Sequence, residues 1–238
     1  MGNLSQPNGL RLMPALSLIG GGGINGFGII KRVNPLSALL GTAAAFSILG
    51  TTISTSGVCS ANWDVGVAGL AGVITSVPTG GLTVGGQTRI VDEIALQAYQ
   101  DLSDAFNAFV AMTPEHVIAG DMINKVLLPG VYYTEAAVTS TGPMTFDDPE
   151  GGGVFVIQMN GGAYTPAAGS STVLKNFAKA SNIFWVLNGG ALSSGGAANI
   201  TGVIVAGGAV TIGDGGSVTG QLLSLGGITM ANNTILST

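Results

Sequence analysis

The sequence of 238 residues carries a formal net charge of −5, and only 8% of its residues are charged. Its seven basic residues are scattered, which excludes the basic surface that nucleic-acid binding requires. The length suffices for one full domain core, and a single cysteine, Cys59, excludes an internal disulfide.

Residues 1–34 form an apolar, glycine-rich segment that differs in composition from the rest of the chain. Glycines interrupt its apolar stretch, so it predicts no integral membrane segment, and it has no clear small-residue cleavage site of a secretion signal. An exposed arm of this composition would aggregate. We therefore expect it to pack against the end of its own domain or against another subunit.

From residue 35 onward the sequence predicts one domain built from short strands. Residues 43–50 are almost wholly apolar, whereas residues 51–57 alternate between hydroxyl side chains and the apolar Ile53. The first pattern is typical of a strand covered on both faces, and the second of a strand covered on one. Similar strands continue to about residue 84.

Residues 88–112 have helical periodicity. Thr88 is expected to cap this helix, Asp92 and Glu93 lie in its first turns, where the helix dipole favours acidic residues, and Pro114 stops it. An apolar stripe runs along one face and consists of Val91, Ile94, Ala98, Ala105, Phe106, Phe109 and Met112. The helix therefore needs an apolar wall to pack against.

The last third of the chain repeats itself. Residues 203–220 align without a gap on residues 221–238, and two earlier segments, beginning at Phe155 and Ile183, open in the same way. A short fixed period of β-branched runs split by glycine pairs is typical of a stacked β-solenoid. The first strand of each repeat is apolar at nearly every position, so it can supply the wall that the helix needs.

The predicted fold is therefore mainly β: a discontinuous β-solenoid with three faces and short rungs, and one long α-helix packed alongside. The helix is inserted between two solenoid portions, residues 36–84 and 126–238, which must stack on each other. The predicted domains are an N-terminal arm, residues 1–34, and a solenoid domain, residues 35–238, that contains the helix at residues 88–112.

The second and third strands of each repeat alternate, so they turn small and hydroxyl side chains outward. This surface carries no charge, and its candidate binding residues are Thr165, Ser193, Thr211, Thr229, Ala163, Ala191, Ala209, Thr201 and Thr219. Rungs stacked at about 4.7–4.9 Å would hold the hydroxyl groups in a regular array that can order water. The simpler interpretation is that outward threonine and serine are merely good solvated strand residues.

Other polar residues form no pattern typical of catalysis. Asp147, Asp148 and Glu150 could bind a cation, but a glycine-rich loop with acidic residues is more often a solvated turn, and His116 has no evident partner. Solenoid enzymes need carboxylates or bases that converge on a groove, so we expect no catalysis, no metal and no cofactor. Three large aromatic residues are assigned to the core rather than to a sugar-binding platform: Tyr132, Trp63 and Trp185.

Six segments carry a resemblance to a known family, and they keep their order along the chain: residues 39–49, 94–102, 128–132, 154–158, 182–185 and 226–235. The motifs Pro129-Gly-Val-Tyr132 and Asn182-Ile-Phe-Trp185 are the more specific ones. On these residues the chain resembles the microbial ice-binding (antifreeze) protein family from about residue 36 to its last residue. The resemblance implies a discontinuous β-solenoid with one flanking helix. Residues 1–34 match nothing in the family. The outward-facing side chains of the second and third strands include serine, alanine and glycine as well as threonine.

Two functions fit these observations. In the first, the protein is secreted or surface-exposed and adsorbs to ice or ordered water through the uncharged Thr/Ser/Ala face. In the second, it is a structural or adhesive subunit of a virion, filament or surface layer, and residues 1–34 contact copies of itself or other structural subunits. The apolar arm and the low surface charge favour the second, because a lone soluble protein normally carries more charge.

Overall fold

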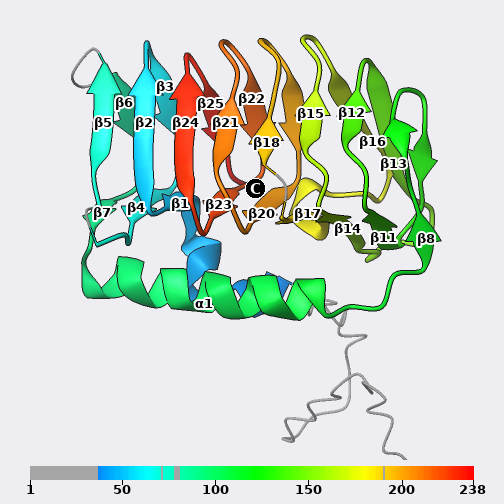
Figure 1. The fold of residues 1–238 in the computed structure, drawn as a ribbon, viewed down its shortest axis with the longest axis horizontal. Helices are drawn as coiled ribbons and strands as arrows, with labels where there is room; N and C mark the ends of the chain where they lie inside the picture. Colours follow the sequence, from blue (N-terminus) through cyan, green and yellow to red (C-terminus); the bar gives the residue numbers. More distant parts are fainter. Residues whose placement is uncertain (1–36, 71, 78–80, 190) are drawn as a thin grey trace, which may run out of the picture. The chain divides into compact units, whose positions relative to one another are not determined.

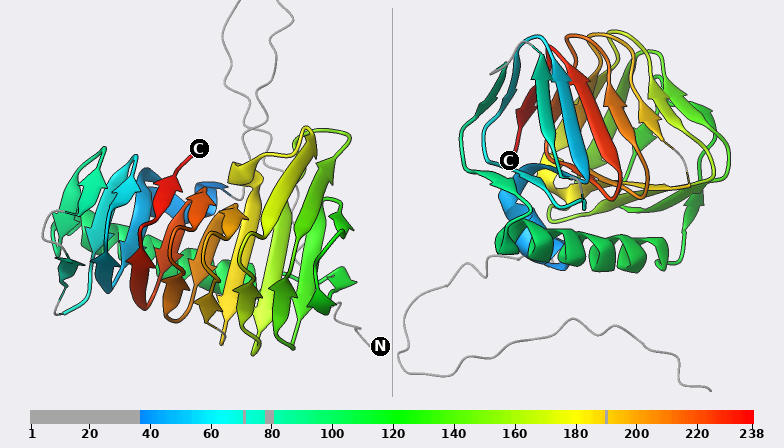
Figure 2. Two further views of the ribbon diagram at one scale, coloured as in Figure 1. Left: turned by 90° about the horizontal axis from the view of Figure 1, so that it is seen from above. Right: turned by 60° about the vertical axis from the view of Figure 1, so that its left-hand side comes forward.

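The computed structural model describes residues 37–70, 72–77, 81–189 and 191–238. The chain divides into two units, Met1–Lys31 and Arg32–Thr238. The arm predicted at residues 1–34 lies outside the described residues. The second unit is a three-sided solenoid of parallel strands with a long helix along one side, which confirms the predicted fold class (Figures 1 and 2).

The side of the solenoid next to helix α1 (Glu93–Val110) is a nine-stranded parallel sheet. In spatial order its strands are β7 (Thr88–Ile90), β4 (Asp64–Val67), β1 (Phe46–Gly50), β23 (Leu222–Ser224), β20 (Val203–Ala206), β17 (Ile183–Asn188), β14 (Phe155–Asn160), β11 (Gly130–Thr134) and β8 (His116–Val117). Strands β14, β17, β20 and β23 are buried along nearly their whole length. Their apolar sequences thus mark strands covered on both faces, as expected.

A second side is an eight-stranded parallel sheet. In spatial order its strands are β5 (Ile74–Val77), β2 (Thr52–Ser56), β24 (Gly227–Ala231), β21 (Val210–Ile212), β18 (Leu192–Ser193), β15 (Tyr164–Pro166), β12 (Val138–Ser140) and β9 (Gly120–Asp121). Burial alternates along β2, β15 and β21, so every second side chain of these strands faces solvent.

The third strand of each rung belongs to one of two further sheets. These two sheets contact each other through β16 and β19. The five-stranded sheet comprises β19 (Asn199–Thr201), β22 (Ser217–Thr219), β25 (Thr234–Leu236), β3 (Cys59–Ala61) and β6 (Leu82–Val84). The three-stranded sheet comprises β10 (Val126–Leu127), β13 (Pro143–Asp148) and β16 (Ser171–Asn176). A short 3-10 turn, η2 (Ala180–Asn182), precedes β17.

The first and last rungs of the chain stack on each other, as the interrupted repeat predicts. In Figure 1 the red strands β23 and β24 lie beside the blue strands β1 and β2, with which they pair in parallel. The Gln221 side chain crosses this junction and donates to the carbonyl oxygens of Ala44 (3.0 Å) and Phe46 (2.7 Å). Gln221 is buried, and its amide supplies donors to both carbonyl groups.

A second polar cluster closes the same junction at the end of the chain. The Ser237 hydroxyl donates to the Ser47 hydroxyl (2.7 Å), and the Asn62 amide donates to the Ser237 carbonyl (3.0 Å). The backbone N–H of Ser237 donates in return to Asn62 Oδ1 (2.7 Å). Residues 175 or more positions apart are therefore held by side-chain bonds as well as by strand pairing.

Replacing Gln221 by leucine is expected to lower the free energy of unfolding by about 2–6 kcal/mol, because two carbonyl groups lose their donor at roughly 1–3 kcal/mol each. Urea titration followed by circular dichroism measures this loss. The matched control is Gln97→Leu, since Gln97 is exposed and its amide only bonds Asp101 on the helix surface. An equal effect of the two substitutions would show that Gln221 does not hold the junction.

The helix begins later than predicted. Thr88 does not cap it, because Thr88 pairs with Val65 in the nine-stranded sheet and is therefore extended. The N-cap is Asp92, whose side chain accepts a bond from the backbone N–H of Ala95 (2.7 Å). A sheet pairing that local sequence cannot reveal thus overrides the local capping signal.

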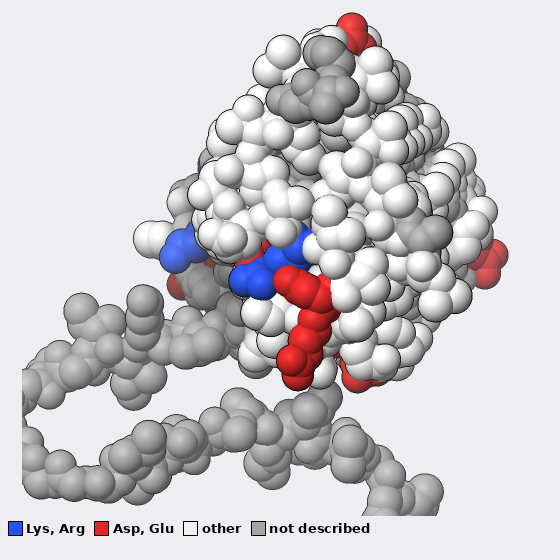
Figure 3. All heavy atoms as spheres, turned by 90° about the vertical axis from the view of Figure 1, so that its left-hand side faces the viewer, with Lys and Arg blue, Asp and Glu red and all other residues white. Residues whose placement is uncertain are grey.

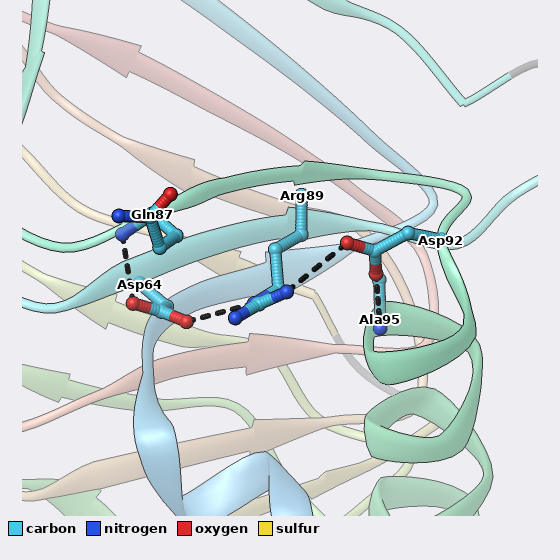
Figure 4. Close-up of polar contacts among 5 residues, drawn as sticks. All are labelled: Asp64, Gln87, Arg89, Asp92 and Ala95. Atoms are coloured by element: carbon cyan, nitrogen blue, oxygen red, sulfur yellow. Dashed lines mark hydrogen bonds and ion pairs between the residues drawn. The ribbon is translucent and has the colours of Figure 1, made fainter.

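One arginine ties the start of the helix to the sheet. Arg89 in β7 donates to Asp64 in β4 (2.9 Å) and to Asp92 (3.2 Å), so it bridges the solenoid and the N-cap (Figure 4). The bond to Asp64 is the main cause that raises the pKa of Arg89. Figure 3 looks onto this end of the solenoid, where the few charged side chains include one mixed group of both signs.

The helix also ends before the predicted residue 112. Its last helical residue is Val110, and the buried Gln158 of β14 donates to the carbonyl oxygens of Phe109 (2.7 Å) and Met112 (2.9 Å). Gln158 thereby satisfies carbonyl groups that a helix end leaves free. The chain leaves the helix here, ahead of Pro114, because the sheet supplies the terminating contact.

The helix packs on the apolar wall, as predicted, but Val91 and Ile94 of the expected apolar stripe are exposed. Leu102 and Phe109 are fully buried, and the Phe109 ring lies 4.8 Å from that of Phe184 in β17. A 3-10 segment, η1 (Ser37–Ala45), joins this contact through Ala43. The strand expected at residues 43–50 therefore begins only at Phe46.

The Thr42 residue of η1 fastens this segment to the helix. Its backbone N–H and its hydroxyl both donate to Asp101 (2.7 Å each), and these bonds lower the pKa of Asp101. Within the described ranges, no helix combines the length and the apolar character needed to cross a membrane.

The second solenoid portion starts earlier than the predicted residue 126. Strand β8 pairs with β11, and β9 pairs with β12, so residues 116–121 form an outer, partial rung. The expectation failed because these strands are two residues long, which is too short to show alternation.

Candidate functional site

Four of the predicted residues form a row on the eight-stranded sheet. Thr165, Ser193, Thr211 and Thr229 are exposed on the consecutive strands β15, β18, β21 and β24. Thr211 lies in register with Ser193 on one side and with Thr229 on the other. Their inward neighbours are all buried: Tyr164, Leu192, Val210, Ile228 and Met230.

The row is longer than the sequence suggested. Ser54 pairs with Thr229 across the junction of the two solenoid portions, Thr75 pairs with Ser54, and Thr139 pairs with Thr165. Seven neighbouring strands therefore each contribute one hydroxyl group. We call this set the hydroxyl row: Thr75, Ser54, Thr229, Thr211, Ser193, Thr165 and Thr139.

A row of small residues borders part of the hydroxyl row, two positions before Thr165, Ser193, Thr211 and Thr229. Ala191 and Ala209 are exposed and Ala163 is half-buried, and Gly227 takes the next place, opposite Thr52. Positions two apart on a strand are about 6.5–7 Å apart, so the two rows run side by side. Beyond Ala191 and Ala209 lies a hollow of about 340 Å³, lined also by Phe106 of the helix and by Asn188, Gly189, Gly207 and Gly208.

Thr201 and Thr219 lie elsewhere. They pair with each other in the five-stranded sheet, where Thr219 is half-buried and Thr201 is only 9% exposed. The expected grouping of all nine residues on one surface is therefore corrected: seven share the eight-stranded sheet side, and these two do not. A glycine-containing corner (residues 213–216) turns the chain between the two sheets.

The hydroxyl row can organise water but holds no group for acid or base chemistry. Thr139 Oγ1 donates to the Thr165 carbonyl (2.7 Å), which fixes that side chain, and β-branching limits rotation of the other threonines. None of the seven residues is charged. Such a surface presents donors and acceptors at the regular spacing of the strands.

The acidic loop residues serve the fold. Asp148 is buried and accepts bonds from the backbone N–H groups of Gly151 (3.0 Å) and Gly153 (2.9 Å), while Asp147 pairs with Lys175 (3.4 Å). Among the described residues, no group of three or more His, Cys, Asp or Glu side chains could hold a metal ion.

The aromatic residues divide between core and edge. Trp185 and Tyr132 are buried as expected, and the Trp185 indole N–H donates to the Thr201 carbonyl (2.9 Å). Trp63 is only half-buried. The His116 ring lies 5.0 Å from that of Tyr132, so it does have a partner, which is structural.

The structure thus combines a three-sided parallel solenoid, a helix along one side of it and an uncharged hydroxyl row on another side. Residues 48–236 match the family model described as Ice-binding-like. The chain therefore belongs to the ice-binding-like family.

Known members and structures agree with this assignment. Ice-binding protein 1 of Shewanella frigidimarina is 29% identical over 186 residues, which cover 64% of this chain and 20% of that protein. An ice-binding protein of the Antarctic ascomycete Antarctomyces psychrotrophicus superposes with a TM-score of 0.77 at 28% identity, covering 83% of this chain and 96% of that one. One from an Antarctic biological consortium gives 0.75 at 30% identity, covering 83% and 89%.

The present chain thus spans about a fifth of the curated relative that it matches, but nearly all of two solved domains. The family match also covers the hydroxyl row completely, from Ser54 to Thr229.

Proposed function

We propose that the solenoid domain binds ice and that the eight-stranded sheet is the surface that adsorbs. The observation that carries this proposal is the hydroxyl row: seven adjacent strands, uncharged and in register, with small residues alongside four of them. The relatives named above are ice-binding proteins. Family membership favours this function over that of an assembly subunit.

Adsorption follows from the order of the side chains. The strands repeat at about 4.7–4.9 Å and the two rows are fixed by the sheet, so water bound to the hydroxyl groups adopts a regular arrangement. Immobile side chains lose little entropy when that water joins a crystal. The alanine and glycine row leaves room for the water layer without a charged group to reorient it.

Nanolitre osmometry of the purified protein tests this function. We expect thermal hysteresis and shaped ice crystals. Absence of both at millimolar concentration would reject the proposal. We propose that the protein adsorbs rather than catalyses, and that it acts outside the cell, secreted or on a surface, where ice meets the organism.

We further propose that residues 1–34 make contacts between subunits. The segment contains nine large apolar side chains: Leu10, Leu12, Leu16, Leu18, Ile19, Ile24, Phe27, Ile29 and Ile30. Burying a side chain of this kind contributes about 1.5–3 kcal/mol, so an exposed segment would be strongly driven to associate.

Deleting residues 1–34 is expected to convert an oligomer into a monomer, because the apolar contacts are lost. Multi-angle light scattering of the full and shortened chains measures the masses. A full-length chain that is already a monomer would refute the subunit contact. Nanolitre osmometry of the full and shortened chains then shows whether association raises the thermal hysteresis per chain.

A further inference from the structure

The hydroxyl row ends at a charge. Strand β9 follows β12 at the outer edge of the eight-stranded sheet, and Asp121 of β9 lies in register with Thr139. Residues in register across parallel strands face the same side of a sheet. Asp121 therefore occupies the eighth place of the row whose other seven places carry hydroxyl groups.

The Asp121 carboxylate is fixed by its neighbours. Its Oδ1 accepts bonds from the backbone N–H groups of Ile123 (3.0 Å) and Thr141 (3.0 Å), and its Oδ2 accepts a short bond from the Thr141 hydroxyl. These bonds, above all the one from the Thr141 side chain, lower the pKa of Asp121. The group is thus ionised and held in place.

Among the described residues, no cationic side chain pairs with this charge. None of the ion pairs between described side chains includes Asp121, and the Lys125 ammonium group bonds instead to the Ala119 carbonyl (2.9 Å). The nearby Glu135 lies in the corner before β12, outside the row, and its carboxylate accepts from the Tyr133 hydroxyl (2.6 Å). Asp121, and not Glu135, is therefore the charged side chain at which the hydroxyl row ends.

An ionised carboxylate holds its hydration shell around its own charge, and removing or rearranging that water is costly. Water ordered by the neighbouring hydroxyl groups cannot continue across it. The opposite end differs, because the row keeps a hydroxyl group, Thr75, up to the outermost strand β5.

We propose that Asp121 is a specificity-determining residue that sets the limit of the ice-adsorbing surface at this end. The inference rests on the proposed function. It predicts that neutralising this residue lengthens the surface by one strand, and that a carboxylate one strand further in shortens it.

The test compares thermal hysteresis at equal molar concentration in wild type, Asp121→Asn and Thr139→Asp. Asparagine keeps the oxygen that accepts from Ile123 and Thr141, so we expect the fold to persist. We expect Asp121→Asn to raise hysteresis by about one seventh, since the row grows from seven strands to eight and each strand adds one ordered polar group. Thr139→Asp is expected to lower it below wild type.

Matched controls separate the row from net charge. Asp104→Asn removes the same charge from an exposed position on the helix, and Thr145→Asp adds one on the three-stranded sheet. Both are expected to leave hysteresis unchanged, with folding checked by thermal melts.

If wild type is active but Asp121→Asn equals or falls below it, the boundary role is overturned. An equal rise in Asp104→Asn would also overturn it, since the effect would then come from net charge. If wild type and both row variants show no hysteresis, the proposed function fails and this inference fails with it.

Discussion

Replacing Thr211 by tyrosine is expected to abolish ice shaping and reduce thermal hysteresis to the buffer level. Thr211 lies in the middle of the hydroxyl row, with Ser193 and Thr229 in register beside it. A tyrosine ring at this exposed position projects beyond its neighbours and separates the surface from a flat crystal face. A flat crystal face must contact all side chains of the row at the same time. One side chain that projects beyond the others therefore removes the contacts of its neighbours as well.

The same substitution is expected to leave stability almost unchanged. Thr211 is exposed and its strand neighbours Val210 and Ile212 fill the core, so the change in the free energy of unfolding should be within about 0.5 kcal/mol. Osmometry and a thermal melt of the same preparation measure the two effects separately.

Thr234→Tyr is the matched control. Thr234 is also an exposed strand threonine, but it lies in β25 of the five-stranded sheet. We expect it to retain activity. If Thr211→Tyr is fully active and Thr234→Tyr is inactive, the adsorbing surface is the five-stranded sheet, where Thr201 and Thr219 lie. Inactivity of wild type as well would favour a structural role.

The last third of the chain was predictable because its information is local. The 18-residue repeat and the alternation around Thr211 depend on residues next to each other in sequence, and a solenoid stacks such repeats directly. The position of the helix followed from the same patterns. The outer face of an all-apolar strand and the apolar face of an amphipathic helix must both be buried, so they pack against each other.

The rest depends on contacts between distant residues. Ser54 and Thr75 join the row only because β2 pairs with β24, across more than 170 positions of sequence. Thr88 has the chemistry of a helix cap, yet a sheet pairing with Val65 holds it extended. The role of Asp121 was hidden because a two-residue strand shows no alternation.

Replacing Trp185 by alanine is expected to have the opposite effect to the change at Thr211. The fully buried ring stacks on Tyr164 with centroids 4.5 Å apart and meets the edge of Phe146 at 5.9 Å. Its removal leaves a cavity and deprives the Thr201 carbonyl of its donor. Truncations of this kind cost about 3–5 kcal/mol, and in a domain of this size that lowers the melting temperature by about 6–20 °C.

Activity per folded molecule should nevertheless persist near 0 °C, because Trp185 faces the interior and the hydroxyl row faces solvent. Folded domains have about 5–15 kcal/mol of stability, so most molecules of the variant remain native in the cold. Trp63→Ala is the control and should cost less, since Trp63 is only half-buried. Equal melting temperatures for the two variants would contradict the core assignment. Loss of hysteresis in folded Trp185→Ala would mean instead that the row depends on the packing directly beneath it, where Tyr164 supports the strand that carries Thr165.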